Sequence, residues 1–542
     1  MRQPCDEGVV LSGKPAVSCG PKSRPWILAA TILASSMAFI DSTVVNVALP
    51  ALQSSLQATV VGVQWVVESY GLFLSALILS GGVLGDVFGR RLMFLLGVGL
   101  FASASIACGL SVNIGQLVIA RSIQGIGAAF LVPGSLAIIS ASFDEKSRGK
   151  AIGTWSGFTA ITTASGPVLG GWLIEHASWH WIFFINVPLA VAVVAISLWQ
   201  TPESRSRLSE HVDWLGALTA TAAVGGLVFG LLESSTFGWS HPLVLGSLMA
   251  GVASLVAFYL VESRVAKSPL VPLQLFRSRV FSGANLLTLL LYSALGIFFF
   301  LFPLNLIQVQ GYSATATGAA ALPMILLMFF LSRWSGGLVL RYGFRRPLFV
   351  GPLIVAAGFA LLALPFAGTN YWVTFFPAFI VLGFGMAVSV APLTTVVMSS
   401  VAQDRAGTAS GINNAVARVA GVLAVAVLGL VMVGAFKYRL MDSLANLNLG
   451  PNIVRDVRSN AIKLAGLELP TSLDPADAAA IRAAVVKSFG FGFRLVMLIC
   501  SGLAIASSAV VMLVIPRAAP PFVKAAASGS LPRRTHDQEE RL

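Results

Sequence analysis

Long apolar runs constrain this chain more than any other feature of its sequence. Of its 542 residues, 56% are hydrophobic and only 11% are charged. A helix rises 1.5 Å per residue, so about 20 apolar residues cross a hydrocarbon layer roughly 30 Å thick. Fourteen runs approach or exceed that length, at residues 26–49, 62–84, 93–112, 114–139, 150–174, 181–199, 214–232, 242–261, 281–307, 316–340, 347–367, 371–397, 408–434 and 489–514. The chain is therefore predicted to be an all-α polytopic membrane protein, and a soluble domain is excluded.

The positions of lysine and arginine predict the orientation of these helices. The short connections after the first, third, fifth, seventh, ninth and eleventh runs contain neither residue, whereas the alternate connections and both chain ends are basic. Because cytoplasmic loops carry an excess of positive charge, the tails 1–24 and 517–542 are expected in the cytoplasm. The net charge of +13 then reflects topology, and nucleic-acid binding is not expected.

Two other features of the sequence bear on its processing and its loops. Four scattered cysteines form no CxxC pair and predict neither a disulfide framework nor a metal site, and the polar N-terminal tail does not resemble a signal peptide. The long outer connection 437–488 is interpreted as a structural cap, with substrate or partner contact as the alternative. Within it, Asp474 and Pro475 are expected to open a short helix that ends near Val486.

An internal repeat divides the chain. GIGAAFLVP begins at Gly125 and RGKAIG follows, while GFGMAVSVAP begins at Gly383 and AGTASG follows at the same 24-residue spacing. We therefore expect a six-helix bundle over 25–200, two inserted helices over 213–262, and a second six-helix bundle over 280–516. Duplicated membrane helices are typical of transporters, in which the substrate route runs between the repeats.

One carboxylate, Asp41, lies inside the first apolar run, nine residues before Pro50. An ionised acid at the centre of a membrane costs roughly 2.5 kcal/mol or more, so it must face protein or water. An acid that titrates in such a place is a candidate proton carrier. The alternative is an acid near a helix end that reaches the membrane surface.

Arg121 in the fourth run keeps its charge and therefore needs a carboxylate partner. Counting from the helix ends places Asp41, Glu68 and Arg121 at similar depths. We expect these three residues to form one proton-coupling set. For Glu68, which belongs to a polar stripe along its helix, the alternative is an outer-end residue in contact with water.

Two glycine-containing motifs predict moving parts. At the cytoplasmic end of the second run, glycines permit close approach of helix ends and the charged residues can form a breakable latch; the alternative is a plain basic loop. These residues are Gly82, Asp86, Gly89, Arg90 and Arg91. In the fifth run, small residues and a proline predict a kinked, tightly packed helix that hinges or seals the outer half. These residues are Gly153, Gly166, Pro167, Gly170 and Gly171.

Together these motifs resemble those of the major facilitator superfamily, and specifically its fourteen-helix drug:proton antiporter family of QacA-like and EmrB-like exporters. The resemblance covers roughly residues 25–516. Its marks are AFIDSTVVNVALP from Ala38, the Gly82–Arg91 segment, RSIQGIGAA from Arg121, GPVLGG from Gly166 and WHWIFFINVP from Trp179. The chain departs from the family pattern at Thr162, His180 and Leu340, and the segment around Asn413 lacks an acid that some relatives carry there.

The resemblance implies the major facilitator fold and proton-coupled efflux of amphipathic or aromatic compounds across a bacterial inner membrane by alternating access. The alternative is a dedicated exporter of one native metabolite, antibiotic or lipid. An enzyme is not expected, because no HExxH or P-loop motif is present. Candidate substrate contacts are Trp65, Tyr70, Gln124, Phe298 and Asn413, although aromatic clusters also form cores or face lipid.

The implied partners are the bilayer, a small-molecule substrate and protons. We expect a monomer that uses the proton gradient and no cofactor or metal. Whether an adaptor or outer-membrane partner takes part stays open.

Overall fold

The structure is a computed structural model that describes residues 23–143, 145–205, 213–266, 269–364, 370–401, 406–445, 447, 449–467 and 473–516. Most of the predicted N-terminal tail and the whole tail 517–542 lie outside the described residues. The described chain is a set of helices, and thirteen of them are long and apolar enough to cross a membrane. The predicted all-α polytopic fold is thus confirmed.

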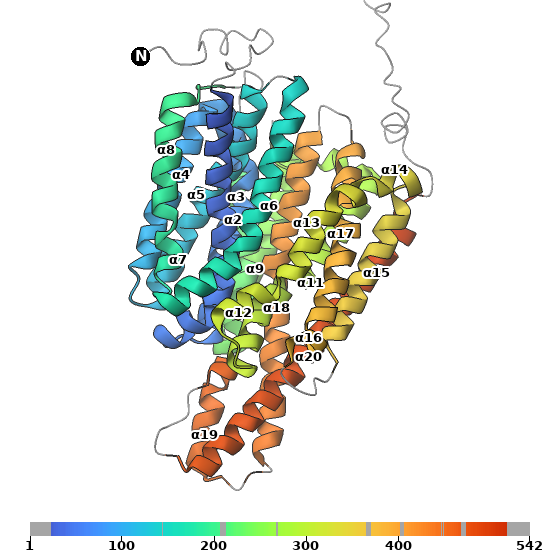
Figure 1. The fold of residues 1–542 in the computed structure, drawn as a ribbon. Helices are drawn as coiled ribbons and strands as arrows, with labels where there is room; N and C mark the ends of the chain where they lie inside the picture. Colours follow the sequence, from blue (N-terminus) through green and yellow to red (C-terminus); the bar gives the residue numbers. More distant parts are fainter. Residues whose placement is uncertain are drawn as a thin grey trace, which may run out of the picture.

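The helices form two halves that lie side by side (Figure 1). The first half contains α2 (Arg24–Ser55), α3 (Val60–Phe88), α4 (Arg90–Gly109), α5 (Ile114–Ser142), α6 (Glu145–His176), α7 (Trp181–Phe184) and α8 (Asn186–Gln200). Two inserted helices follow, α9 (Trp214–Phe237) and α10 (Pro242–Leu260), with short turns η1 (Val261–Val265) and η2 (Leu273–Arg277) leading on from them.

The second half begins with α11 (Arg279–Leu304) and the π turn η3 (Asn305–Val309). It continues with α12 (Ala314–Ala320), α13 (Leu322–Gly336), α14 (Leu338–Tyr342), α15 (Arg345–Leu362), α16 (Tyr371–Thr374), α17 (Phe376–Ser399), α18 (Ala406–Ala445), α19 (Pro451–Asn460), η5 (Ala461–Gly466) and α20 (Pro475–Leu513). We call the end of the bundle that holds Arg90, Arg91 and Arg345 the basic end, which is uppermost in Figure 1, and the other the neutral end.

Side-chain caps fix where several helices begin. Thr59, Asn113, Ser278 and Asp474 each accept a hydrogen bond from a backbone amide in the first turn of the helix that follows. Such caps satisfy amides that have no partner within the helix. The sequence predicted the last of these starts from Asp474 and Pro475.

The fifth predicted span, 150–174, corresponds to α6, which is absent from the thirteen apolar helices although it has 32 residues. Glycine, threonine and serine dilute its apolar content. The count of fourteen spans is compatible with the structure once α6 is included. Its low apolar content has a structural reason, because α6 contacts a central cavity described below.

The prediction of a separate short helix that ends near Val486 is wrong. Pro475 opens α20, and this helix runs without interruption to Leu513. Residues 476–513 contain no proline, so nothing removes the hydrogen bonds that propagate the helix. The C-terminal part of α18, α19 and the start of α20 therefore form a helical extension at the neutral end (Figure 1).

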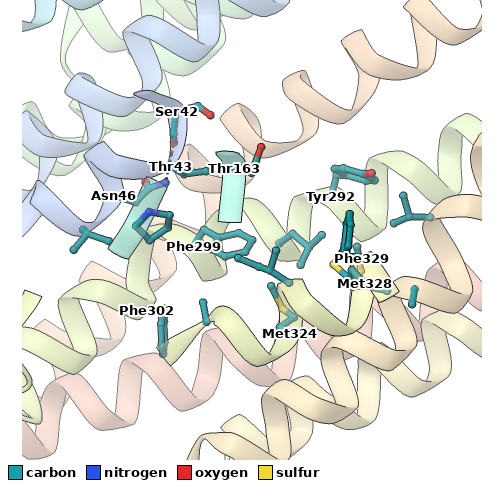
Figure 2. Close-up of a pocket in the computed structure, with 18 of the residues that line it drawn as sticks. Ser42, Thr43, Asn46, Thr163, Tyr292, Phe299, Phe302, Met324, Met328 and Phe329 are labelled. Carbon is teal, nitrogen blue, oxygen red and sulfur yellow. Dashed lines mark hydrogen bonds between the residues drawn. The ribbon is translucent and has the colours of Figure 1, made fainter. Parts of the chain in front are cut away.

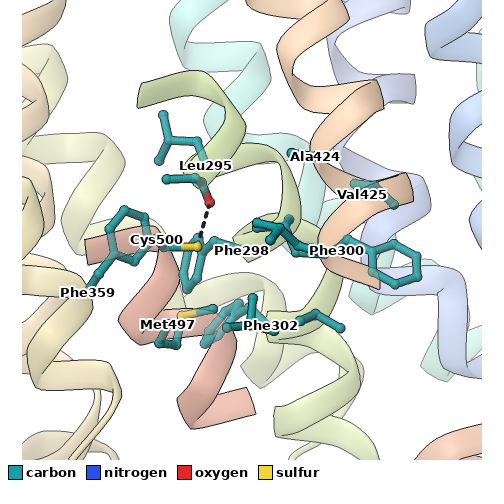
Figure 3. Packing of buried hydrophobic residues seen from close by; sticks show 14 of the residues in the cluster. Leu295, Phe298, Phe300, Phe302, Phe359, Ala424, Val425, Met497 and Cys500 are labelled. Carbon is teal, nitrogen blue, oxygen red and sulfur yellow. Dashed lines mark hydrogen bonds between the residues drawn. The ribbon is translucent and has the colours of Figure 1, made fainter. Parts of the chain in front are cut away.

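The core of the second half is rich in aromatic side chains (Figure 3). Phe298 is fully buried, and its ring centroid lies 5.2 Å from that of Phe302 and 5.8 Å from that of Phe359. Cys500 packs in the same cluster and donates to the backbone oxygen of Ala294. This cluster gives the second half a rigid apolar interior.

Candidate functional site

A buried ion pair lies inside the first half. The guanidinium of Arg121 on α5 donates through Nη1 to Oδ2 of Asp41 on α2 over 2.5 Å, and both side chains are almost fully buried. Arg121 also donates to the backbone oxygen of Val66 and lies over the ring of Tyr70, 4.2 Å from its centroid. The structure thus places the predicted arginine and one of its two candidate carboxylates in direct contact.

Polar side chains from three more positions complete this cluster. Gln124 donates to Asp41 over 2.8 Å and accepts from Arg121 over 2.7 Å, so its amide bridges the pair. Asn186 on α8 donates to Asp41, and Ser105 on α4 accepts from both Gln124 and Asn186. A buried ion pair needs such bonds to offset the loss of water. We define the buried cluster as Asp41, Ser105, Arg121, Gln124 and Asn186.

Sequence reasoning did not single out Ser105 or Asn186 as functional. The sequence did hold a signal for Asn186, because its amide interrupts the apolar residues that follow Trp181 within WHWIFFINVP. Ser105 belongs to a stretch of small residues in α4 and gave no signal of its own. Only the fold shows that α4 and α8 bring these two side chains beside Asp41.

Glu68 does not belong to the buried cluster. Its side chain is buried, yet its Oε2 has no hydrogen-bond partner among the described residues. One turn earlier on the same stripe of α3, Gln64 donates to the backbone oxygen of Val425 on α18. The polar stripe therefore faces the second half, and no hydrogen bond or ion pair joins Glu68 to Asp41 or Arg121 among the described residues, because Glu68 lies on a different face of α3 from Tyr70. The coupling of Glu68 to the other two residues stays a prediction.

A cavity of about 710 Å³ lies between the two halves (Figure 2). The first half contributes Ser42, Thr43 and Asn46 from α2 with small residues of α6. The second half contributes rings and thioethers, namely Tyr292, Phe299, Phe302, Met324, Met328, Phe329 and Met386. No described residue in its wall is charged. Such a surface suits amphipathic or aromatic molecules, because methionine and aromatic side chains adapt to varied apolar shapes.

The buried cluster and the cavity share the helix α2. Asp41 points into the first half, while the next residue, Ser42, lines the cavity. The adjacent positions differ by about 100° around the helix axis, so one helix presents an acid to one side and polar side chains to the other. A change at Asp41 can therefore reach the cavity wall through a rigid element.

None of the five predicted substrate contacts lines the central cavity. Trp65 donates to Glu233 of α9, Tyr70 lies against Arg121, and Gln124 belongs to the buried cluster. Phe298 is part of the aromatic core, and Asn413 donates to Asn285 and Thr288 of α11. The physical reason is helix rotation, since Phe299 rather than Phe298 faces the cavity.

The glycines of α6 act at two places. A Cβ atom at Gly166 or Gly170 would collide with Thr43 or Val44 of α2, and one at Gly171 would collide with the backbone of Ala314 at the start of α12. Gly153, nearer the basic end, has nothing within 4 Å of its Cβ direction and lines the cavity. Only glycine permits the close contacts, and Pro167 packs at this point against Gly318.

The two halves are held together at the neutral end. Glu175 of α6 accepts from the backbone amide and the hydroxyl of Thr315, at 2.8 and 2.6 Å. Gln308 of η3 donates to Gln53 of α2 over 2.8 Å, and Gln53 donates to the backbone oxygen of Lys463 in η5. Together with the glycine contacts, these bonds close the cavity towards the neutral end.

The predicted gating motif forms contacts within the first half. Asp86 accepts from Arg90, one turn along, at 2.7 and 2.8 Å. Glu203, which sequence reasoning missed, accepts from the backbone amides of Arg91 and Leu92. Gly89 has a φ of +121°, and a Cβ there would collide with the Glu203 carboxylate. The latch therefore ties the α3–α4 turn to the segment after α8, and Gly82 faces Pro133 of α5.

Comparisons with known proteins agree with this architecture. The sequence profile of the Major Facilitator Superfamily matches residues 31–425. The tetracenomycin C resistance and export protein of Streptomyces glaucescens is 34% identical over 500 residues, covering 91% of this chain and 92% of that protein. The multidrug resistance protein Stp of Mycobacterium tuberculosis (strain ATCC 25618 / H37Rv) is 36% identical over 406 residues, which is 75% of each chain.

Solved structures of other transporters share the fold. A bacterial homolog of the human lysosomal transporter Spinster, in an inward-facing and unoccupied conformation, superposes with a TM-score of 0.61 at 17% identity, covering 91% of this chain and 98% of that one. The inward-open xylose transporter XylE from E. coli gives a TM-score of 0.54 at 14% identity, covering 92% and 98%. At these identities the likeness concerns the fold alone.

Proposed function

Because the chain belongs to the major facilitator superfamily, we propose that it exports amphipathic or aromatic drug-like compounds in exchange for protons. The observation that carries the proposal is the Asp41–Arg121 pair, which lies one residue from the wall of an uncharged cavity between the halves. The names of its relatives, which describe resistance and export, support the substrate class. An antiporter of this kind needs no cofactor, because the proton gradient supplies the energy.

In the proposed cycle, substrate enters the cavity from the basic end, which the positive-inside rule assigns to the cytoplasm. The halves then rock so that the contacts of Glu175 and Gln53 at the neutral end open. A proton from outside neutralises Asp41, and the loss of its charge weakens the hold on Arg121. Substrate leaves, the halves return, and the proton is released inside.

The coupling in this cycle depends on differential proton affinity, while the proton gradient supplies the energy. A proton shifts a two-state equilibrium only if it binds one state more tightly than the other. A rearrangement of α5 against α2 would change the contact between Arg121 and Asp41, and with it the proton affinity of that acid. One charge that crosses a potential of 100 mV delivers about 2.3 kcal/mol.

The experiment measures uptake of tetracenomycin C into inside-out proteoliposomes that carry an imposed pH gradient. The parent protein is compared with Asp41→Asn and with Asp442→Asn, which removes an acid from the exposed extension at the neutral end. We expect gradient-driven accumulation by the parent and the control, and none by Asp41→Asn. Equal accumulation by all three proteins would remove Asp41 from the mechanism.

A dedicated exporter of one native compound is the second candidate. The relative that covers 91% of this chain is named for a single antibiotic, which favours that possibility. A deletion strain challenged with a panel of unrelated toxic compounds separates the two. Protection against several classes supports a multidrug exporter, and protection against one class supports a dedicated exporter.

We further propose that the protein works as a monomer in the inner membrane with both termini in the cytoplasm. The inserted helix α9 packs against α3 and α18 of the same chain. Residues of that one chain form the wall of the central cavity, so a second copy is not needed to complete it. Cross-linking in native membranes tests this, because a transport-competent dimer would appear at twice the mass. A need for an adaptor protein would appear as transport in cells that is lost in proteoliposomes.

A further inference from the structure

A second cavity, distinct from the one between the halves, lies where the inserted helices meet both halves. Its volume is about 240 Å³, and it shares no wall residue with the central cavity. The wall contains Ser75 and Leu79 of α3, Ala223 of α9, Phe258 of α10 and Val416 of α18, among others. We call it the side pocket. α9 contacts α3 of the first half and α18 of the second half.

The side pocket is apolar throughout. Its one hydroxyl, that of Ser75, already donates to the backbone oxygen of Leu72. Among the described wall side chains a ligand would find no free donor, and the only acceptor is the oxygen of Ser75. The occupant must therefore be a saturated or aromatic apolar group, and the small volume suits one chain rather than a folded molecule or a protein helix.

The position of the pocket fixes which membrane leaflet it adjoins. Ser75 to Leu79 lie in the part of α3 that approaches Phe88, and Val416 lies near the start of α18. Both helix ends belong to the basic end. Residues 270–276, which connect α10 to α11 there, supply part of the wall.

Positively charged residues lie close in the sequence to this part of the pocket wall. Arg264, Arg277 and Arg279 have exposed side chains, and none has a hydrogen bond or ion pair within the described chain. Arg277 directly follows Phe276 of the wall. Basic groups beside a crevice between membrane helices on the cytoplasmic side are a recurring environment for anionic lipid headgroups.

The two acids in this region face inward, and each keeps one buried oxygen without a hydrogen-bond partner, Oε1 of Glu262 and Oδ2 of Asp213. Glu262 is buried and accepts from the backbone amide of Val271 over 3.1 Å, which holds the connection over the pocket. Asp213 accepts from the amide of Gly216 as the cap of α9. The charge presented to the membrane is therefore that of the arginines.

We propose that the side pocket binds an acyl chain of an anionic phospholipid from the leaflet at the basic end. The phosphate-bearing headgroup lies against Arg264, Arg277 and Arg279. A lipid in this place touches α3 of the first half, α18 of the second half and the inserted helices at once. The inserted pair thereby gains a role, since it encloses a lipid at a joint between the two moving halves.

The test uses native mass spectrometry of the full-length protein with palmitoyl-oleoyl phosphatidylglycerol or palmitoyl-oleoyl phosphatidylcholine. Ala223→Trp fills the pocket, and Ala250→Trp on the exposed face of α10 is its matched control. Arg277→Gln with Arg279→Gln removes two headgroup contacts. Arg341→Gln with Arg346→Gln removes the same charge from the basic end elsewhere. Ala220→Phe, on the same wall, is a second filling variant.

The parent and both controls should retain one phosphatidylglycerol more tightly than phosphatidylcholine. Ala223→Trp and Ala220→Phe should lose this bound lipid, and the Arg277 and Arg279 double variant should bind phosphatidylglycerol roughly tenfold more weakly. Excess inorganic phosphate should not displace the lipid. If the folded variants Ala223→Trp and Ala220→Phe retained phosphatidylglycerol as well as the parent, the side pocket would not be the binding site of the acyl chain. If the Arg277 and Arg279 double variant retained phosphatidylglycerol fully, or if phosphate displaced the lipid, the assignment of an anionic phospholipid would be wrong.

Discussion

The two halves share a packing pattern but differ in chemistry at one pair of equivalent positions. In the repeat, Gly125 of α5 corresponds to Gly383 of α17, and each faces backbone of the second helix of its own half, at Tyr70 and at Met324. Four residues earlier stand Arg121 in the first half and Phe379 in the second. The same site on the same fold thus holds a buried cation in one half and a ring in the other.

The neighbours of these two residues differ in the same way. Arg121 bonds to Asp41, whereas the ring centroid of Phe379 lies 5.1 Å from that of Phe302 and 6.1 Å from that of Phe298. A repeat fixes how helices pack, because glycine contacts depend on backbone approach rather than on charge. It leaves each half free to specialise, so that the first holds a buried ion pair, for which we propose proton exchange, and the second holds an apolar aromatic core.

Replacing each member of this pair should give the largest difference in export. Arg121→Met leaves the Asp41 charge buried without its partner, which costs about 3–5 kcal/mol of folding free energy and abolishes gradient-driven transport. Phe379→Met keeps a similar apolar volume and should cost less than about 1.5 kcal/mol while export continues. Thermal unfolding and proteoliposome flux measure both. Similar losses in the two variants would mean that the halves are not specialised.

Disrupting the close glycine contact between the halves should have the next largest effect. Gly171→Ala places a methyl group against the backbone of Ala314, and overpacking costs roughly 1–3 kcal/mol. Because the proposed cycle opens this contact together with those of Glu175 and Gln53, the population should shift about tenfold or more towards the opened state.

An impermeant maleimide that labels Asn46→Cys from outside measures this shift. Asn46 lines the cavity, the native Cys108 and Cys500 are buried, and Cys5 and Cys19 are replaced by serine in every labelled protein. Gly99→Ala on α4, which has open space, is the control and should leave labelling unchanged. Slower or unchanged labelling in Gly171→Ala would contradict the assignment of this contact to the closed state.

Substitution of two adjacent phenylalanines of α11 should distinguish a core residue from a residue of the cavity wall. Phe299→Ala removes a ring from the cavity wall and should raise the apparent KM about fivefold, with little change in unfolding temperature. Phe298→Ala opens a hole in the aromatic core and should cost about 3 kcal/mol or more of stability, with the apparent KM unchanged in the folded fraction. The reverse pattern would show that the ring facing substrate has been misassigned.

The smallest effect concerns the inserted helices. Trp65→Phe removes the bond from the indole to Glu233 and should lower the free energy of unfolding by about 1 kcal/mol without a change in export rate. Trp172→Phe, whose side chain is half exposed, is the control and should change neither quantity. A loss of export in Trp65→Phe would restore this residue as a substrate contact.

Sequence patterns predicted the long-range architecture well because membrane spans depend on apolar length, which is a local property. The same patterns placed Arg121 beside a carboxylate, because an unpaired cation in a membrane is so costly that its partner can be sought by depth. Depth alone could not separate Asp41 from Glu68, since the choice depends on which face of α3 turns towards α5.

The cavity wall was harder to predict for the same reason. A run such as Phe298 to Phe300 is apolar on every side, so its periodicity does not show which ring faces the other half. Ser42 and Asn46, one turn apart on α2, did indicate the cavity in the sequence, because polar side chains within a membrane helix must face water or protein. Glu203 left no signal, because its role depends on two backbone amides more than 100 residues away.

The most direct test of the account compares two modes of transport by Asp41→Asn in the same proteoliposomes. Counterflow exchanges labelled for unlabelled tetracenomycin C and needs no net proton movement, whereas uphill accumulation needs a pH gradient. We predict that Asp41→Asn retains counterflow and loses gradient-driven accumulation. Gradient-driven accumulation at the parent rate, with Asp41 neutralised, would contradict the claim that this buried acid couples protons to export.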